Sequence, residues 1–242
     1  MNLVALQTKT SQDFKQNLKH IKELITSCED NSFILAPELC LTGFCYERMD
    51  EASQFATKAI KKIKKLSKNK TITITFIEKQ ELGFFNTLYI FHNKEIIHVQ
   101  SKHRLFPLGN EPEHFQSGEI DNMKILDING MKVAVLICFE IRFPQYWLKV
   151  LGADLILNPS MWGAKRKNHY ETMTKALAVA NQCYVLAANS ADDNMAKSSG
   201  IITPWGEEIR DDSKEIISHE MNIEEVKKVR KYIDIGLEKK WK

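Results

Sequence analysis

Short apolar stretches alternate along the chain with longer stretches in which apolar residues recur every three or four positions. Leu18, Ile21, Leu24 and Ile25 show the second spacing, which is typical of a helix with one buried face. The spacing predicts helices at 13–28, 51–67, 144–151, 168–182 and 223–231. Compact apolar or β-branched runs predict strands at 2–7, 32–36, 71–78, 88–92, 95–100, 123–129, 131–137, 153–158, 184–189, 200–203 and 208–210.

Two of the predicted strand pairs are joined by tight turns, at residues 93–94 and 129–130, whereas other strands are separated by helices. Hairpins combined with strand–helix–strand connections predict an α/β fold with mixed sheets. No linker, repeat or low-complexity stretch interrupts the pattern. We therefore expect one domain over residues 1–242, with a basic tail after its last helix.

Composition narrows the classes of function. The chain has 43% hydrophobic and 27% charged residues, and 34 basic against 31 acidic residues give a net charge of +3. This balance gives no reason to expect a nucleic-acid or membrane partner. The lysine-rich stretch at 61–70 is interpreted as the solvated face of a helix, because Ile60, Ile63 and Leu66 keep a helical spacing.

The five cysteines are odd in number and irregularly spaced, and no two form a Cys-x-x-Cys pair. This argues against a disulfide framework and against a zinc site, so a reducing compartment is expected. The N-terminus does not resemble a signal peptide, and no apolar run reaches the length of a membrane span. The sequence therefore predicts a soluble cytoplasmic protein without a bound metal.

Cys138 follows the apolar run 133–137 and precedes a charged, helix-compatible segment. A sharp turn between a strand and a helix, called an elbow, holds a nucleophile rigidly and exposes its reactive atom. The backbone N–H groups that follow the nucleophile then point at the substrate oxygen on which negative charge develops. The alternative is a free cysteine that serves as a small core residue.

Glu38 and Lys102 also stand at the ends of predicted strands. A thiol with a pKa of about 8.5 is a weak nucleophile at neutral pH, and a nearby carboxylate acting as general base would activate it. An ammonium would stabilise both the thiolate and the oxyanion formed on a carbonyl or nitrile substrate. Alternatively, Glu38 caps a helix and Lys102 is an ordinary loop lysine.

The three segments resemble, in this order, the nitrilase superfamily of carbon–nitrogen hydrolases: APELCLTGF around Glu38, SKHRLFP around Lys102 and ICFEIRFP around Cys138. The stretches FFNTLYIF, ADLILNPSMW and ITPWGEE are also similar to the family. The resemblance implies a four-layer α-β-β-α sandwich with two mixed sheets. It also implies a homodimer or higher homo-oligomer with helical layers in contact.

The resemblance further implies a cofactor-free reaction. Glu38 would deprotonate Cys138, Lys102 and the backbone N–H of Phe139 would hold the oxyanion, and a thioester would form before hydrolysis. Glu111, in GNEPEHFQSG, matches a second active-site glutamate of the family.

Arg142 and Trp162 are further candidates for the site, as substrate-binding residues. Arg142 is a candidate for binding a substrate carboxylate, with a structural salt bridge as the alternative. Trp162 either walls the pocket or simply packs.

Within the family, the motifs HRLFP and CFEIRFP look most like the omega-amidase and deaminated-glutathione-amidase branches, which hydrolyse small carboxylated amides. Two alternatives stay open. One is an N-carbamoyl amide hydrolase of the beta-ureidopropionase or N-carbamoylputrescine amidase type. The other is a catalytically silent scaffold that keeps the fold.

Overall fold

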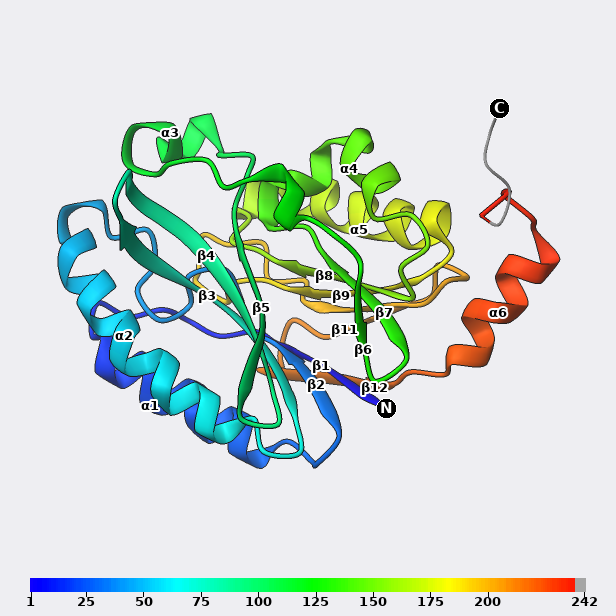
Figure 1. Ribbon diagram of the computed structural model, residues 1–242, viewed down its shortest axis with the longest axis horizontal. Coiled ribbons are helices and arrows are strands. Elements are labelled where there is room, and N and C mark those ends of the chain that lie inside the picture. The colour runs from blue at the N-terminus through cyan, green and yellow to red at the C-terminus, as the bar shows by residue number, and fades with distance from the viewer. Residues whose placement is uncertain (238–242) are drawn as a thin grey trace.

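Two six-stranded sheets pack face to face in the centre of the molecule (Figure 1), in a computed structural model that describes residues 1–237. The first sheet has the order β12 (Ile216–Glu220), β1 (Asn2–Leu6), β2 (Ser32–Leu35), β3 (Thr71–Gln80), β4 (Gly83–His92) and β5 (Glu95–Ser101). The second has the order β11 (Glu208–Arg210), β10 (Gly200–Ile202), β9 (Tyr184–Ala188), β8 (Leu155–Pro159), β7 (Met131–Val135) and β6 (Leu126–Ile128).

In each sheet the three central strands are parallel and the outer strands are antiparallel. The predicted mixed sheets are therefore confirmed. The segments that follow β2 in the first sheet and β8 in the second lie side by side, where Glu38 N donates a hydrogen bond to Ser160 O at 3.2 Å.

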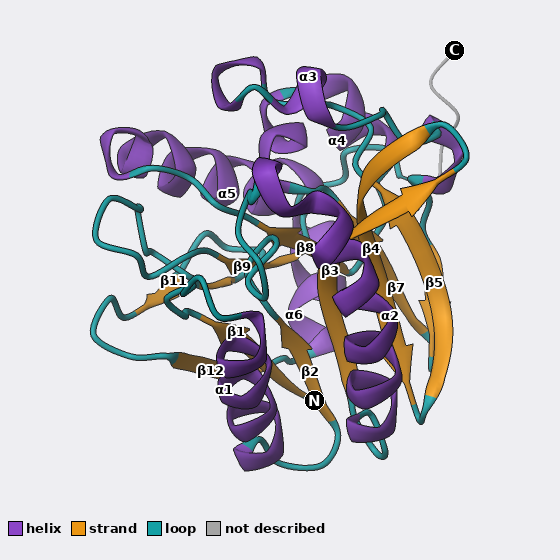
Figure 2. Ribbon diagram, turned by 90° about the vertical axis from the view of Figure 1, so that its left-hand side faces the viewer, coloured by secondary structure: helices purple, strands orange, loops and turns teal. Residues whose placement is uncertain are grey.

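Helices cover the outer faces of both sheets, which completes the predicted four-layer sandwich (Figures 1 and 2). Helices α1 (Phe14–Ser27) and α2 (Met49–Leu66) lie against the first sheet, and α4 (Pro144–Lys149) and α5 (Lys167–Asn181) lie against the second. The short helix α3 (Glu111–His114) follows β5, and α6 (Ile223–Tyr232) follows β12. Asp13 caps α1 by accepting hydrogen bonds from the backbone N–H groups of Lys15 and Gln16.

Strand β1 shows how the two-residue period of a strand builds two separate cores. Leu3 and Ala5 belong to the core between the sheets, whereas Val4 and Leu6 pack beneath α1 and α2. The run is apolar throughout because both of its faces are covered.

Three strands differ from the prediction. Strand β12 was not predicted, because only its first two residues are apolar and its partner is β1, at the other end of the chain. Strand β4 begins at Gly83 rather than at 88, because Gly83 and Asn86 are poor strand formers that the ladder with β3 nevertheless includes. Strand β6 is limited to 126–128, because only these three residues pair with β7, and residues 123–125 lead into it from a 3₁₀ turn at 120–122.

No helix within residues 1–237 is long and apolar enough to cross a membrane. The predicted basic tail lies outside the described residues from 238 onward.

Candidate active site

Cys138 lies at a strained elbow between the second sheet and a short 3₁₀ turn. Strand β7 ends at Val135, and Cys138 begins the turn η4 (Cys138–Arg142) with a φ of +48°. This left-handed conformation is unfavourable for a residue with a Cβ, and such strain concentrates at functional positions. The side chain is buried. The predicted elbow is therefore present.

Glu38 follows β2 and is fully buried. Its Oε1 accepts hydrogen bonds from Lys102 Nζ and from Asn86 Nδ2, both at 2.8 Å. Its Oε2 is also buried but has no hydrogen-bond partner among the described residues. One carboxylate oxygen is thus fixed in place while the other remains able to accept a proton.

Lys102 follows β5 and is likewise fully buried. Its Nζ lies 2.8 Å from Glu38 Oε1 and 2.7 Å from Glu111 Oε1. Burial opposes the charge, but the carboxylates of Glu38 and Glu111 outweigh it and raise the pKa of Lys102 above its ordinary value. The ammonium therefore stays charged at neutral pH, and the interpretation of Lys102 as an ordinary loop lysine is wrong.

Glu111 is the first residue of α3, and its side chain points back toward Lys102. Its Oε2 accepts a hydrogen bond from the backbone N–H of Phe106 at 3.1 Å. Burial raises its pKa, although the Lys102 ammonium opposes this. The structure thus places Glu111 beside the other residues, whereas Glu113, two positions on, is exposed.

The Cys138 thiol lies close enough to Glu38, Lys102 and Glu111 for their charges to alter its ionisation. Burial raises the pKa of the thiol well above its ordinary value, the Glu38 carboxylate raises it further, and the Lys102 ammonium only partly offsets both. The resting side chain is therefore a neutral thiol, and forming the thiolate requires a group that takes the proton.

Glu140 is a buried residue of this region that the sequence analysis missed. Its Oε2 accepts a hydrogen bond from Ile137 N at 2.6 Å, and its Oε1 accepts from His103 N at 2.7 Å and Arg104 N at 3.3 Å. Burial raises its pKa to about 7, although these N–H groups act in the opposite direction. One side chain thus ties the cysteine elbow to the loop after Lys102. The only signal in the sequence is an acid two positions after the nucleophile.

A pocket opens above the cysteine. It is lined by Phe106, Cys138, Phe139, Arg142, Met161, Trp162 and Arg166. The three residues predicted to contact substrate, Phe139, Arg142 and Trp162, all belong to this lining. The Arg142 guanidinium lies 4.5 Å from the centre of the Trp162 ring, and its Nη2 is 3.1 Å from His169 Nδ1. Within residues 1–237 no carboxylate forms a salt bridge with Arg142, so the structural alternative has no support there.

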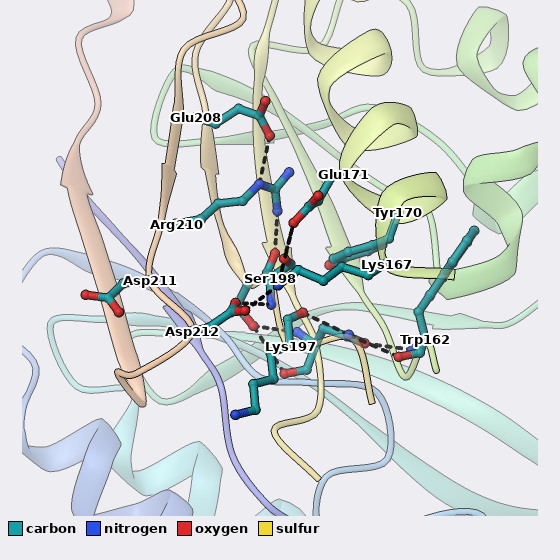
Figure 3. A network of polar contacts seen from close by, with 12 residues as sticks. Trp162, Lys167, Tyr170, Glu171, Lys197, Ser198, Glu208, Arg210, Asp211 and Asp212 are labelled. Atoms are coloured by element: carbon teal, nitrogen blue, oxygen red, sulfur yellow. Dashed lines mark hydrogen bonds and ion pairs between the residues drawn. The ribbon is translucent and has the colours of Figure 1, made fainter. Parts of the chain in front are cut away.

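A polar network behind the pocket holds the wall that carries Trp162 (Figure 3). Asn189 accepts a hydrogen bond from Trp162 N at 2.7 Å and donates to Lys197 O at 2.9 Å. Ser198 N donates to Asp212, and Arg210 links Ser198 O to Glu208. The segment around 197–198 is thereby anchored between α5 and β11, and Trp162 cannot shift independently of it.

In the part of the chain that the structure describes, no group of three or more His, Cys, Asp or Glu side chains could hold a metal ion. The chemistry available at the site is that of a buried thiol, two carboxylates and an ammonium.

Comparisons with known proteins identify the family of the chain. The family model for carbon–nitrogen hydrolases matches residues 3–231. The chain is 29% identical over 234 residues to a 2-oxoglutaramate amidase of Bacillus subtilis, a match that covers 91% of this chain and 90% of that protein. It is 27% identical over 206 residues to omega-amidase YafV of Escherichia coli, covering 81% and 78% of the two chains.

Among solved structures, Saccharomyces cerevisiae Nit3, a member of branch 10 of the nitrilase superfamily, superposes with a TM-score of 0.84. The two share 21% sequence identity, and the match covers 97% of this chain and 94% of the other. At this identity the superposition establishes the fold. Because the family model spans nearly the whole chain, this protein belongs to the carbon–nitrogen hydrolase family.

Proposed function

We propose that the protein hydrolyses the C–N bond of a small linear amide through a thioester on Cys138 and releases ammonia. The arrangement of Glu38 is the observation that carries this proposal. Lys102 and Asn86 fix one oxygen of its carboxylate, and the other is buried without a partner among the described residues. The charge of this carboxylate acts on the Cys138 thiol and helps to raise the pKa of that thiol. This is the arrangement that a general base for a cysteine nucleophile requires.

In the first half of the reaction, Glu38 Oε2 takes the proton of the Cys138 thiol as Sγ attacks the carbonyl carbon of the amide. The oxyanion of the tetrahedral intermediate is held by the Lys102 ammonium and by the backbone N–H of Phe139. Each such donor is worth roughly 10²–10³ in rate. Glu38 then passes its proton to the amide nitrogen, the C–N bond breaks, and ammonia leaves a Cys138 thioester.

In the second half, Glu38 takes a proton from a water molecule that attacks the thioester carbon. The same two donors hold the second oxyanion. When the C–S bond breaks, the acid product leaves and the sulfur regains its proton from Glu38. Glu111 holds the ammonium as a second carboxylate partner, so that Lys102 keeps its charge and its position through both halves.

The substrate class follows from two observations. The relatives described above are a 2-oxoglutaramate amidase and an omega-amidase, and this chain aligns with most of the length of each. In the pocket, Arg142 offers a guanidinium that has no acidic partner among the described residues. We therefore propose an amide that bears a free carboxylate, which Arg142 binds.

The test is ammonia release by the purified protein from small carboxylated amides and from N-carbamoyl compounds. Rapid acid quenching followed by mass spectrometry would detect the thioester on the peptide that contains Cys138. We expect ammonia and the thioester with an amide. Ammonia with carbon dioxide, from N-carbamoyl compounds alone, would assign the N-carbamoyl alternative. A protein that is inert on every substrate and is not alkylated at Cys138 by iodoacetamide would be a scaffold.

A further inference from the structure

Two arginines reach the catalytic pocket, and neither has an acidic partner within residues 1–237. Arg142 comes from η4, and Arg166 ends a separate 3₁₀ turn, η5 (Ala164–Arg166). Of the other four arginines, Arg48, Arg210 and Arg230 each pair with a carboxylate, and Arg104 lies over the ring of Phe143 outside the pocket lining. Both side chains are only partly buried, and the pocket lining supplies no negative charge, so an anion bound there would be attracted by both guanidiniums.

Aromatic rings hold both guanidiniums. Arg142 stacks over Trp162 at 4.5 Å, and Arg166 lies over Phe106 at 5.1 Å from the centre of the ring. A ring covers the flat face of a guanidinium and leaves the N–H edges available for hydrogen bonds. Burial and the charge of Arg166 both lower the pKa of Arg142, so the two guanidiniums lie close enough for one charge to act on the other.

The rest of the lining offers donors and apolar surface. The indole Nε1–H of Trp162 is buried and has no acceptor among the described residues. None of the lining residues is acidic. The pocket therefore suits a ligand end that carries negative charge and several acceptor oxygens, and it disfavours a protonated amine.

We propose that Arg142 and Arg166 together form the subsite for the free carboxylate of the substrate, and that Arg166 makes the enzyme select amides with a terminal carboxylate over neutral or amine-bearing amides. The inference rests on the proposed function, since the carboxylate must lie on the molecule whose amide Cys138 attacks. Arg142 belongs to the same turn as the nucleophile, whereas Arg166 comes from the wall that carries Trp162, so the anion would bridge the two.

Two substrates of equal chain length isolate the effect: the monoamide of glutaric acid, which has a terminal carboxylate, and pentanamide, which has a methyl group there. For Arg166→Gln we expect kcat/KM on the monoamide to fall about 10- to 100-fold, mainly through KM, as expected for losing a charge-assisted hydrogen bond. On pentanamide the change should stay within about twofold of wild type. Arg166→Lys should retain part of the preference for the monoamide over pentanamide. Lysine keeps the positive charge but lacks the paired N–H groups with which a guanidinium binds both oxygens of a carboxylate.

Lys165→Gln is the matched control, because Lys165 is exposed on the same turn and removing it changes the net charge equally. It should leave both substrates unaffected. An equal fall on both substrates in Arg166→Gln would overturn the proposal and make Arg166 a structural residue.

Glutarate binding gives a second readout that does not depend on turnover. Glutarate should raise the melting temperature of the wild type and of Lys165→Gln, but not that of Arg166→Gln. If neither amide is hydrolysed, the proposed function fails, while a glutarate shift that Arg166→Gln abolishes still supports the subsite. A shift that persists in Arg166→Gln, or no shift in the wild type, would overturn it.

Discussion

Cys138 depends on its neighbours because burial suppresses its own ionisation. Its pKa is raised by burial and by the Glu38 carboxylate, so proton transfer to that carboxylate must accompany attack. Lys102, by contrast, keeps its positive charge because two carboxylates outweigh its burial. At the scale of single residues, the site therefore combines a neutral nucleophile with a permanent cation.

Replacing Cys138 with alanine should abolish turnover and change the melting temperature by less than about 2 °C. Both residues carry a Cβ, so the strain of the left-handed backbone is the same in each. Cys183→Ala is the control: this cysteine is fully buried in the core, so its loss should cost about 1 kcal/mol of stability and leave kcat unchanged. Ammonia assays and thermal melts measure both, and a large melting shift in Cys138→Ala would show that the residue mainly packs.

Glu140→Gln should lower kcat about 10- to 100-fold. Both carboxylate oxygens of Glu140 accept backbone hydrogen bonds, whereas the glutamine amide has only one acceptor oxygen. Losing one of these bonds should displace Cys138 or Lys102, and small displacements of reacting groups lower the rate strongly. Glu140→Asp should recover part of the activity. A pH profile separates this role from simple stability. The pKa of Glu140 is about 7, so as pH falls from 8 to 6 the carboxyl gains a proton and loses acceptor capacity.

The wild-type kcat should therefore decline through pH 7 on the acid side, and Glu140→Gln should lack this decline. The groups that interact electrostatically with Glu140 include Lys102 and Tyr146. The backbone N–H of His103 donates to Glu140, so His103→Gln keeps this hydrogen bond while it removes an imidazole from the same loop. This variant is the control and should keep the decline. An unchanged profile in Glu140→Gln would assign the decline to another group.

At the scale of elements, the segment after α3 packs its backbone directly against the end of β5. Gly118 N donates to Lys102 O at 2.8 Å, and Gly118 O accepts from His103 Nδ1 at 2.7 Å. A Cβ at position 118 would lie 2.3 Å from Ser101 O, which is backbone and has little freedom to move. Glycine is needed here for close approach, and the segment holds the residue that carries the ammonium.

Gly118→Ala should therefore displace the Lys102 backbone. We expect a loss of about 1–3 kcal/mol in the free energy of unfolding, as for overpacking elsewhere, together with a fall in kcat. Ser117→Ala, at the exposed neighbouring position, should change neither. Chemical denaturation and steady-state kinetics provide the test. If Gly118→Ala had the wild-type free energy of unfolding and the wild-type kcat, the close contact between residue 118 and the end of β5 would not be needed for stability or activity.

The sequence predicted those helices and strands whose own residues show a helical or strand-like spacing of apolar positions. Glu38, Lys102 and Cys138 were found because each follows an apolar strand within a family motif. Glu140 was missed because its partners, the backbone N–H groups of residues 103 and 104, come close only after folding. Arg166 was missed for a different reason: within the run AKRK it resembles any solvated basic residue, and only the pocket distinguishes it.

At the scale of the whole molecule, several large apolar side chains are exposed on the side of the second sheet. Val179 on α5 is 49% exposed and contacts the turn that bears Trp205, whose ring centre lies 5.8 Å from that of Tyr232. Exposed clusters of this kind commonly mark interfaces. The resemblance to the family predicts a homodimer with helical layers in contact, and this cluster lies on such a layer.

We therefore expect the protein to be a dimer in solution and Val179→Glu to shift it to a monomer, as measured by light scattering after gel filtration. Leu82→Glu is the control, because Leu82 is 80% exposed at the turn between β3 and β4, in the first sheet. It should leave the dimer intact. A monomeric wild type, or an unchanged dimer in Val179→Glu, would contradict the expectation.

The reacting groups are divided between the two sheets. Glu38 and Lys102 follow strands of the first sheet, whereas Cys138 and Trp162 follow strands of the second. The rate of turnover therefore reports whether the two sheets are packed against each other in the native arrangement. Consider a partly denatured form that keeps the hydrogen bonds within each sheet but in which the two sheets have separated. It would release no ammonia, although its far-UV circular dichroism spectrum would still resemble that of the native protein.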